Sequence, residues 1–367
     1  MNIVDDRINP TLLKLLKATV GAEASDLHLI PGYRATYRIH GRLSGAAGEV
    51  LDRGTTRAMV ESILPEPALH RVDELKNMDF SVSLRNGGQA IRFRVNVFFS
   101  QGDLCACFRY IPNDIPSFDW MSFPKELAHR MVHLTNGLVI ITGITGSGKT
   151  TTLAALIEML NTEGGYRIIT VEEPIEYVFA RRETTVITQR EVGTDVASFY
   201  DGLKYGLRQD PDVVLVGEIR DRETAQMALS AAETGHLILT TLHTMDAKGA
   251  VTRLVDLFPS DSQDDIRTQL SLSLRYVVAQ HLLPNRVEGQ KRALALEVMT
   301  TNHPIRAAIR DGKIASLESA IQTGKKDGMF PLDNSLEDLV ASGQITYETA
   351  IRYAKDPQNI HVTRPTH

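Results

Sequence analysis

The sequence predicts an α/β protein of two domains, and three observations support this fold class. From about residue 125, apolar runs of strand length alternate with longer helical patterns, as in a parallel sheet that helices cover on both faces. A complete phosphate-binding motif stands between the first of these strands and the first of these helices. Residues 1–112 mix short strand and helix patterns instead, so we expect a separate small α+β domain there. The chain has 367 residues, enough for two domains that each bury a core.

Composition narrows the classes of protein that fit. Hydrophobic residues make up 43% and charged residues 23%, as in a folded protein rather than a disordered or membrane-embedded one. The net charge of -5 argues against electrostatic binding to nucleic acid of any base sequence. We also expect no specific nucleic-acid partner. The first residues lack the pattern of a signal peptide, and no apolar run approaches the roughly 20 residues of a spanning helix. We therefore expect a cytoplasmic protein without a transmembrane segment.

Alternating patterns predict strands in the first domain. Residues 34–44, RATYRIHGRLS, alternate and turn at Gly41, which predicts a hairpin. Residues 59–67, MVESILPEP, have apolar residues at helical spacing and stop at proline. Residues 89–112, QAIRFRVNVFFSQGDLCACFRYIP, predict two strands joined by a turn near Gln101 and Gly102.

The two predicted strands of residues 89–112 place different side chains on their two faces. Arg92 and Arg94 should share one face of the first strand, and its other face should carry Ile91, Phe93, Val95 and Val97. The two cysteines of the chain, Cys105 and Cys107, should share a face of the second strand. We expect them to be buried free thiols, because a metal site needs further ligands and a disulfide rarely suits this spacing.

Residues 113–124, NDIPSFDWMSFP, contain prolines and no regular pattern, and we interpret them as an irregular linker between the domains. The second domain then covers residues 125–367. Its predicted strands are residues 137–142, 167–173, 213–218 and 236–244, and its predicted helices are residues 151–161, 198–208 and 223–235. After about Ala250 the pattern becomes mostly helical, so we expect a helical C-terminal region.

Residues 143–150, GITGSGKT, match the motif G-x-x-x-x-G-K-[ST] in full. Its glycines let backbone N–H groups turn toward phosphates, and the following helix points its positive end at them. Lys149 can neutralise terminal phosphate oxygens, and the Thr150 hydroxyl can bind Mg²⁺. We therefore predict a site for ATP and Mg²⁺ that includes Gly143, Thr145, Gly146, Ser147, Gly148, Lys149, Thr150 and Thr151.

Hydrolysis needs a carboxylate at the carboxyl ends of neighbouring strands, where open α/β sheets bind ligands. Glu218 follows the apolar strand 213–216 and is the candidate. Many P-loop enzymes carry Asp just before such a glutamate, but here the position is Gly217, so Mg²⁺ would rely more on Thr150 and nearby carboxylates. A second candidate set follows the strand at residues 167–171 and comprises Glu172, Glu173 and Glu176.

Two histidines lie near opposite ends of the strand-like run of residues 236–244. His236 opens the strand, and His243 lies just past its far end. Because only the far end faces the phosphates, His243 is the better candidate for sensing the γ-phosphate. For His236, a role in packing and a role at the nucleotide site are equally good explanations.

The sequence resembles the type II/IV secretion ATPases and, within them, the type IV pilus retraction ATPases. The resemblance spans nearly the whole chain in family order, through SDLHLIPGYRATYRIHGRL, RFRVN, CFRYIP, GITGSGKTTTLAALI, VEEPIEY, LRQDPDVVLVGEIRD, TGHLILTTLHT and IQTGKKDGMFPLDNSLEDLVASGQIT. It implies an N-terminal PAS-like domain, a RecA-like P-loop ATPase domain with a helical C-terminal region, and a homohexamer that binds ATP between domains and between subunits.

The resemblance also implies roles for single residues. VEEPIEY resembles the family's acidic box, with Glu173 where Asp is common, and Glu218 resembles the catalytic base. His236 and His243 match the histidine box. Arginines of the N-terminal domain reach the nucleotide as fingers in this family, and the matching positions are Arg92, Arg94 and Arg109, of which we rank Arg94 and Arg109 first.

Retraction is the favoured function within the family. Extension motors commonly build a zinc site from four cysteines, and this chain has two. The resemblance implies a motor for pilus retraction and twitching motility, peripheral to the inner membrane, with a membrane platform protein and an assembly ATPase as partners. Residues 312–330 would contribute to the surface that transmits force. The alternatives are a pilus assembly or type II secretion ATPase, a nucleic-acid motor of the RecA class, and a nucleotide-dependent scaffold without turnover.

Overall fold

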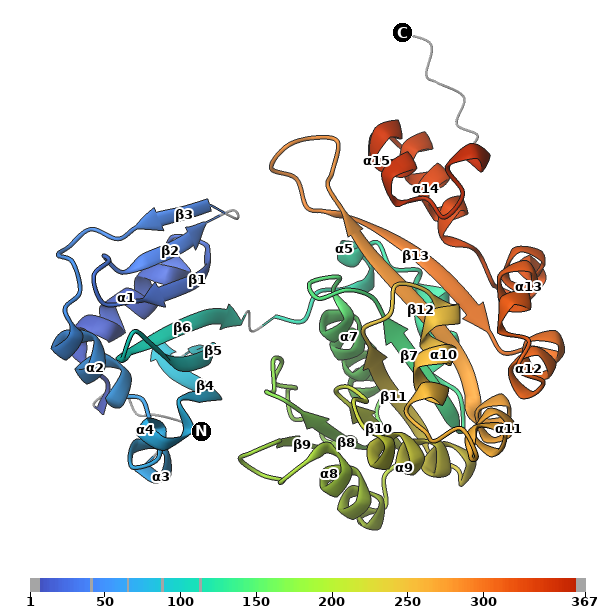
Figure 1. The fold of residues 1–367 in the computed structure, drawn as a ribbon, viewed down its shortest axis with the longest axis horizontal. Coiled ribbons are helices and arrows are strands. Elements are labelled where there is room, and N and C mark those ends of the chain that lie inside the picture. Colours follow the sequence, from blue (N-terminus) through green and yellow to red (C-terminus); the bar gives the residue numbers. More distant parts are fainter. Residues whose placement is uncertain (1–6, 40–41, 65, 87–88, 112–113, 361–367) are drawn as a thin grey trace, which may run out of the picture. The chain divides into compact units, whose positions relative to one another are not determined.

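The structure, a computed structural model, describes residues 7–39, 42–64, 66–86, 89–111 and 114–360 (Figure 1). The chain divides into two compact units. The first is Met1–Asp114 with Pro174–Val178, and the second is Ile115–Glu173 with Phe179–His367. Both units combine a sheet with helices, so the predicted α/β class is confirmed.

An antiparallel sheet of six strands, in the order β3-β2-β1-β6-β5-β4, forms the first unit. The strands are β1 (Ala24–Leu29), β2 (Thr36–Ile39), β3 (Arg42–Gly45), β4 (Asn77–Asn86), β5 (Gln89–Ser100) and β6 (Asp103–Ile111). The helices are α1 (Pro10–Gly21), α2 (Arg53–Glu61), α3 (Glu66–Leu69) and α4 (Val72–Leu75). The predicted turn at Gly41 lies outside the described residues, although the strands on either side, β2 and β3, are paired.

The prediction for residues 89–112 is confirmed through residue 111. Gln101 and Gly102 join β5 to β6 with φ of 52° and 85°, the left-handed conformation that such a tight hairpin turn needs. The apolar face of β5 is buried, and Arg92 and Arg94 lie on the other face. Cys105 is buried, Cys107 is half-buried, and both are free thiols whose pKa burial raises.

A sheet of seven strands, in the order β13-β12-β7-β11-β10-β8-β9, forms the second unit. The strands are β7 (Gly137–Thr142), β8 (Arg167–Glu172), β9 (Val186–Glu191), β10 (Val213–Val216), β11 (Leu237–Leu242), β12 (Leu274–Leu283) and β13 (Ala293–Thr300). All neighbours run parallel except β13, which is antiparallel to β12. Every residue of the central strands β7, β10 and β11 is buried, which explains their continuous apolar sequences.

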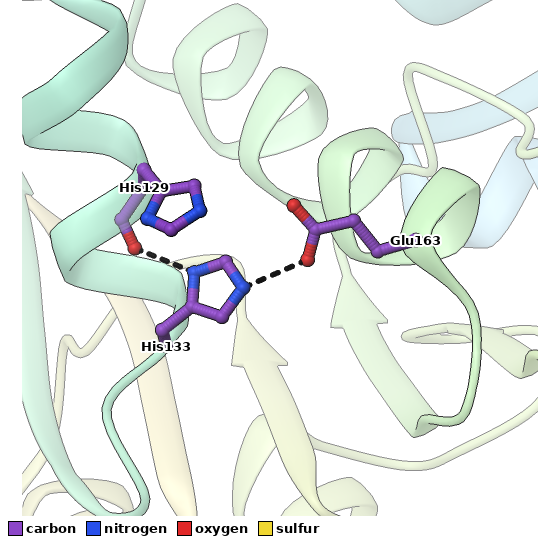
Figure 2. Close-up of side chains that lie close together, drawn as sticks. All are labelled: His129, His133 and Glu163. Carbon is purple, nitrogen blue, oxygen red and sulfur yellow. Dashed lines mark hydrogen bonds and ion pairs between the residues drawn. The ribbon is translucent and has the colours of Figure 1, made fainter.

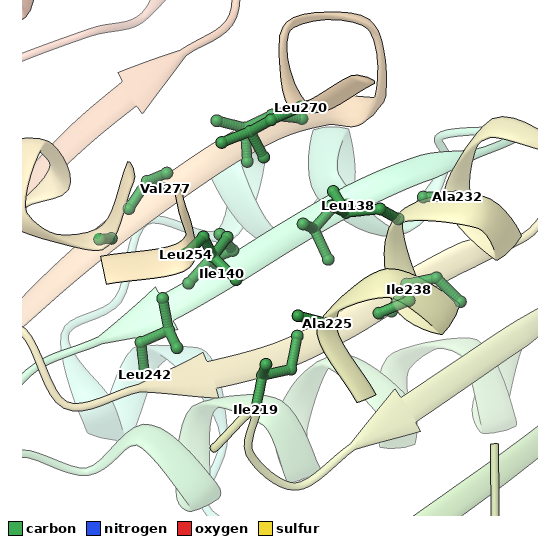
Figure 3. Packing of buried hydrophobic residues seen from close by; sticks show 14 of the residues in the cluster. Leu138, Ile140, Ile219, Ala225, Ala232, Ile238, Leu242, Leu254, Leu270 and Val277 are labelled. Carbon is green, nitrogen blue, oxygen red and sulfur yellow. The ribbon is translucent and has the colours of Figure 1, made fainter. Parts of the chain in front are cut away.

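Helices cover this sheet: α5 (Phe118–Met121), α6 (Lys125–Val132), α7 (Lys149–Glu163), α8 (Phe199–Gly206), α9 (Arg222–Glu233), α10 (Ala247–Asp256), α11 (Gln263–Ser273), α12 (His303–Arg310), α13 (Leu317–Thr323), α14 (Leu332–Ala341) and α15 (Tyr347–Tyr353). Figure 3 shows Leu138 and Ile140 of β7 packed in one core with side chains of α9, α10 and α11. Several helices have an N-cap residue whose side chain accepts a hydrogen bond from a backbone N–H of the first turn. These N-cap residues are Asn9, Asp52, Ser198, Asp221 and Asp246.

Two sequence-based interpretations are incomplete. Residues 113–124 are not wholly irregular, because Ser117 caps the one-turn helix α5. The region after Ala250 contains helices as expected, α11 to α15, and in addition the long hairpin of β12 and β13, which was not predicted. Both strands of the hairpin are largely buried, so their sequences lack the alternation of apolar and polar residues that marks a half-exposed strand. Short apolar runs of this kind cannot be told from a buried helix by their sequence pattern.

An ion pair between the half-buried Lys355 and the buried Glu297 joins the C-terminal helices to the rest of the second unit. Lys355 follows α15, and its Nζ lies 2.7 Å from Glu297 Oε2 and 3.3 Å from Asp246 Oδ2. The Glu297 side chain is 2% exposed, and its Oε1 also accepts the N–H of Ala247 at the start of α10. Burial lowers the pKa of Lys355, but the two carboxylates outweigh this effect and raise it overall.

We expect Lys355→Met to destabilise the protein by about 3 kcal/mol, because Glu297 would keep its charge without a buried partner. The apparent unfolding temperature should fall by roughly 6–12 °C, as followed by circular dichroism. Because the pKa of Lys355 is raised above the ordinary 10.5, the contribution is complete at neutral pH and lost only as pH rises past that value. Lys313→Met is the control, since Lys313 is 73% exposed. Equal effects of the two substitutions would contradict the prediction.

Candidate active site

The phosphate-binding motif has the predicted context of strand, loop and helix. β7 ends at Thr142 and α7 begins at Lys149. The loop between β7 and α7 contains Gly143, Gly146 and Gly148, whose φ angles are 145°, 81° and 90°. Residues other than glycine rarely adopt such positive φ angles. A Cβ at Gly143 would lie 2.5 Å from the Gln280 carbonyl oxygen and 2.5 Å from Ser147 Oγ. The motif therefore needs glycine here both for backbone conformation and for space.

The polar groups of the loop point inward. The Lys149 side chain is buried, and its Nζ donates to the carbonyl oxygens of Gly143 at 2.8 Å and Ile144 at 3.2 Å. Ser147 Oγ is buried and has no hydrogen-bond partner among the described residues. Thr150 and Thr151 lie half-buried in the first turn of α7, and Thr145 is exposed at the tip of the loop. A curved loop around a buried ammonium, with a buried hydroxyl in need of a partner, fits a bound polyphosphate.

Neighbouring strands hold the loop in place. Thr142 Oγ1 donates to the Thr244 carbonyl oxygen at 2.7 Å, so the end of β7 is tied to the residues that follow β11. On the other side, Gln280 Nε2 of β12 donates to Thr152 Oγ1 of α7 at 3.0 Å. Gln280 is a supporting residue that the sequence does not reveal, because its strand was not predicted. The run VVAQHLL, with β-branched residues next to one another, is the weak signal that indicates a strand there.

Glu218 lies at the centre of a charged cluster beyond the carboxyl ends of β8, β10 and β11. Its Oε2 accepts from His243 Nε2 at 3.1 Å, and its Oε1 lies 2.6 Å from Arg220 Nη2. Arg220 also contacts Glu173 Oε2 through Nη1 at 3.2 Å. The structure thus brings Glu218, His243 and Glu173 together, and Arg220 joins the two carboxylates.

Arg220 is a site residue that the sequence-based reasoning missed. It lies two positions after Glu218 in VGEIRD, where nothing in the local pattern distinguishes it from a solvated arginine. Its hydrogen bond to Glu218 is the main cause of the raised pKa of Arg220, so the guanidinium stays charged. The Glu218 side chain is only 14% exposed between Arg220 and His243.

Two other residues of this edge have structural explanations. A Cβ on Gly217 would lie 3.3 Å from the Val171 carbonyl oxygen and 3.5 Å from Glu172 Cα, so an aspartate there would be crowded. The Glu172 side chain is buried, and its Oε1 accepts from Thr170 Oγ1 at 2.6 Å and Gln189 Nε2 at 3.2 Å. These partners belong to β8 and β9, so Glu172 supports the end of the sheet.

His236 lies at the opposite end of β11 from His243. The six residues of β11 separate them by about 20 Å. The His236 Nδ1 lies 3.2 Å from the Ala231 carbonyl oxygen, and its own carbonyl accepts the N–H of Gly137 at the start of β7. Within its own chain, this placement gives His236 a packing role.

The predicted finger arginines lie side by side in the first unit. Arg94 of β5 is the direct cross-strand partner of Arg109 of β6. Arg109 Nε donates to the buried Asp26 at 2.9 Å, and although burial opposes the charge, Asp26 raises the pKa of Arg109 overall. Arg94 has longer ion pairs, at 3.7 Å to Asp79 and 4.0 Å to Glu176. The segment with Glu176 groups with the first unit, and Arg92 Nη2 donates to Ser81 at 2.9 Å.

Among the described residues, no helix combines the length and the apolar character needed to cross a membrane.

The chain is similar to secretion and pilus ATPases. The family model described as type II/IV secretion system protein matches residues 4–328. The type IV pilus retraction ATPase PilT of Pseudomonas aeruginosa is 39% identical over 348 residues, which are 95% of this chain and 99% of that protein. A twitching motility protein of Neisseria gonorrhoeae is 38% identical over 88% of this chain and 85% of its own length. A crystal structure of the pilus retraction motor PilT with bound ADP is similar with a TM-score of 0.85 at 38% identity, covering 94% of this chain and 97% of that one.

Proposed function

Because the chain belongs to the type II/IV secretion system protein family, we propose that it is an ATPase that powers type IV pilus retraction. One observation of the structure carries the proposal. Glu218 and His243 are in contact beyond the carboxyl ends of strands that neighbour the phosphate loop, as a hydrolytic site requires. A scaffold that only binds a nucleotide would not need this carboxylate.

The second unit supplies the groups that hold ATP. Lys149 and the N–H groups of residues 143–150 bind the phosphates, and Ser147 Oγ is placed to donate to them. The Thr150 hydroxyl would hold Mg²⁺, and Glu173, which lies in the charged cluster around Arg220, would be a further candidate ligand. When bound, Mg²⁺ neutralises charge that develops on the phosphate oxygens.

Glu218 orients the attacking water and takes its proton. His243 shares this carboxylate and lies just past β11, where it can respond to the presence of the terminal phosphate. Arg220 acts as a positioning residue, because it holds Glu218 and Glu173 through one guanidinium.

The first unit completes the site with arginine. In this proposal residues 1–112 form a PAS-like domain, residues 113–124 the linker, and residues 125–367 a RecA-like domain with a C-terminal helical region. Arg94 and Arg109, with Arg92 beside them, reach the nucleotide when domains close within a homohexamer. Closure that depends on ATP couples hydrolysis to motion.

The motor acts in the cytoplasm at the inner-membrane pilus machine. It pulls pilin subunits back through a membrane platform protein and works against an assembly ATPase. Residues 312–330, which include α13, contribute to the surface that transmits the force.

Two measurements test this function. The purified chain should release phosphate over many turnovers with ATP and Mg²⁺, and DNA should not stimulate it. A deletion strain should extend pili that fail to retract. Absence of turnover would support the scaffold, DNA stimulation a nucleic-acid motor, and a strain without pili an assembly ATPase.

A further inference from the structure

Three side chains of the kind that bind metals meet on the second unit, away from the phosphate loop. His129 and His133 lie four residues apart at the end of α6, so they share one face of that helix. Glu163 is the last residue of α7, which packs against α6. One ligand atom from each of the three lies within 4.8 Å of the others, and Figure 2 shows the two rings beside the carboxylate.

This cluster is separate from the nucleotide site. Lys149 is the first and Glu163 the last of the 15 residues of α7, so the two are about 21 Å apart along the helix. His133 lies just before β7, and Glu163 lies just before β8. The cluster therefore lies at the amino ends of these parallel strands, and the phosphate loop lies at their carboxyl ends.

The hydrogen bonds of His133 fix where its proton is. The Nδ1 lies 2.8 Å from the carbonyl oxygen of His129, and a carbonyl can only accept, so Nδ1 carries hydrogen. The other ring nitrogen, Nε2, faces Glu163 Oε2 at 2.9 Å. If the His133 ring were neutral, the lone pair of Nε2 would face a lone pair of Glu163 Oε2 at contact distance. The arrangement therefore requires a cation between them, either a proton on Nε2 or a metal ion.

The types of ligand atom and the bond of His133 to the backbone suit a metal ion. Zinc binds imidazole nitrogen at about 2.0–2.1 Å and carboxylate oxygen at about 2.0–2.2 Å, which at a tetrahedral angle separates the two ligand atoms by about 3.3–3.5 Å. His133 Nε2 and Glu163 Oε2, 2.9 Å apart, would therefore move apart by about half an ångström to hold the ion, as two exposed side chains can. Histidine ligands usually donate their second N–H to a carbonyl or carboxylate, as His133 does. The His129 ring stacks on His133 at 3.9 Å between centroids, and two adjacent imidazolium cations would repel each other.

We propose that His129, His133 and Glu163 form a site for a first-row transition-metal dication of the zinc class. Two imidazole nitrogens and one carboxylate oxygen suit Zn²⁺, whereas Mg²⁺ takes mainly oxygen ligands. The His133 and Glu163 side chains are 36% and 35% exposed, so an ion can enter from solvent and water can complete its coordination. The bound metal joins α6 to the end of the helix that begins at the phosphate loop.

Titration of the untagged, full-length protein with Zn²⁺ after removal of bound metal tests the proposal. We expect saturable binding of one ion per chain by calorimetry, and a higher unfolding temperature with Zn²⁺ present. His129→Ala should weaken binding at least about tenfold and remove most of the thermal shift. His129 is exposed, so this substitution leaves the fold and the contact between His133 and Glu163 in place.

Two further variants make the result decisive. Glu163→Gln keeps the size of the side chain but removes its charge, and should weaken Zn²⁺ binding as well. His303→Ala, at another exposed histidine of the same unit, should leave the affinity unchanged. Absence of saturable Zn²⁺ binding, or Zn²⁺ binding that His129→Ala leaves unchanged, would overturn the proposal and leave a protonated His133 paired with Glu163.

Discussion

Arg94→Ala should lower ATP turnover by about 10³- to 10⁵-fold while leaving nucleotide binding nearly unchanged. The phosphate loop that binds ATP belongs to the second unit, and Arg94 belongs to the first. Arginine stabilises the charge that spreads over the transferred phosphate, which is greatest in the transition state, so its loss affects the rate more than the affinity. The effect should therefore appear in kcat.

Arg94 is a better test than its neighbour Arg109. Arg109 is bonded to the buried Asp26, so its removal would also leave a buried carboxylate without its 2.9 Å partner. The ion pairs of Arg94 are 3.7 Å and 4.0 Å long, so less of the native structure depends on it. Phosphate release measures turnover, and a fluorescent ATP analogue measures affinity.

Arg42→Ala is the matched control, because Arg42 is an exposed arginine on the edge strand β3 of the same unit. It should turn over ATP at the parental rate. If Arg94→Ala also kept the parental rate, the first unit would not supply the finger through this residue.

Glu218→Gln should lower turnover by about 10²- to 10⁴-fold and retain ATP binding, as expected for the loss of a general base. Glutamine keeps the size of the side chain, and its carbonyl oxygen can still accept from Arg220. Its amide NH2 group then faces His243 Nε2, which can accept that hydrogen bond in the other ring tautomer. Glutamine cannot take a proton from water, so the substitution removes the chemistry and disturbs the cluster little. Single-turnover phosphate release would show that the hydrolytic step itself has slowed.

Glu223→Gln is the control for this experiment. Glu223 is exposed in the first turn of α9, five residues from Glu218, so its loss should not change the rate. Parental turnover by Glu218→Gln would refute the assignment of the base, and equal losses in both variants would indicate a general effect of charge.

Much of the second unit could be predicted because its signals are local. The strands β7, β8, β10 and β11 are apolar throughout or nearly so, and the helices α7, α8 and α9 have the helical period, so each is visible in its own residues. The positions of Glu218 and His243 just past strand ends were enough to expect both near the phosphates, since parallel strands share one carboxyl edge. Their contact at 3.1 Å agrees with that expectation.

The sequence alone determined the phosphate loop, the strands that feed it and the residues at their ends, because short-range spacing and side-chain chemistry define them. Only the tertiary structure decided that Gln280 supports the loop, that Arg220 joins Glu173 to Glu218, and that Glu163 meets His129 and His133. Apart from the contact of Arg220 with Glu218, these contacts join residues from 30 to 128 positions apart, and no repeating pattern in the sequence indicates such pairs. They exist because the sheet order places distant strands and helices side by side, and that order is a property of the whole fold.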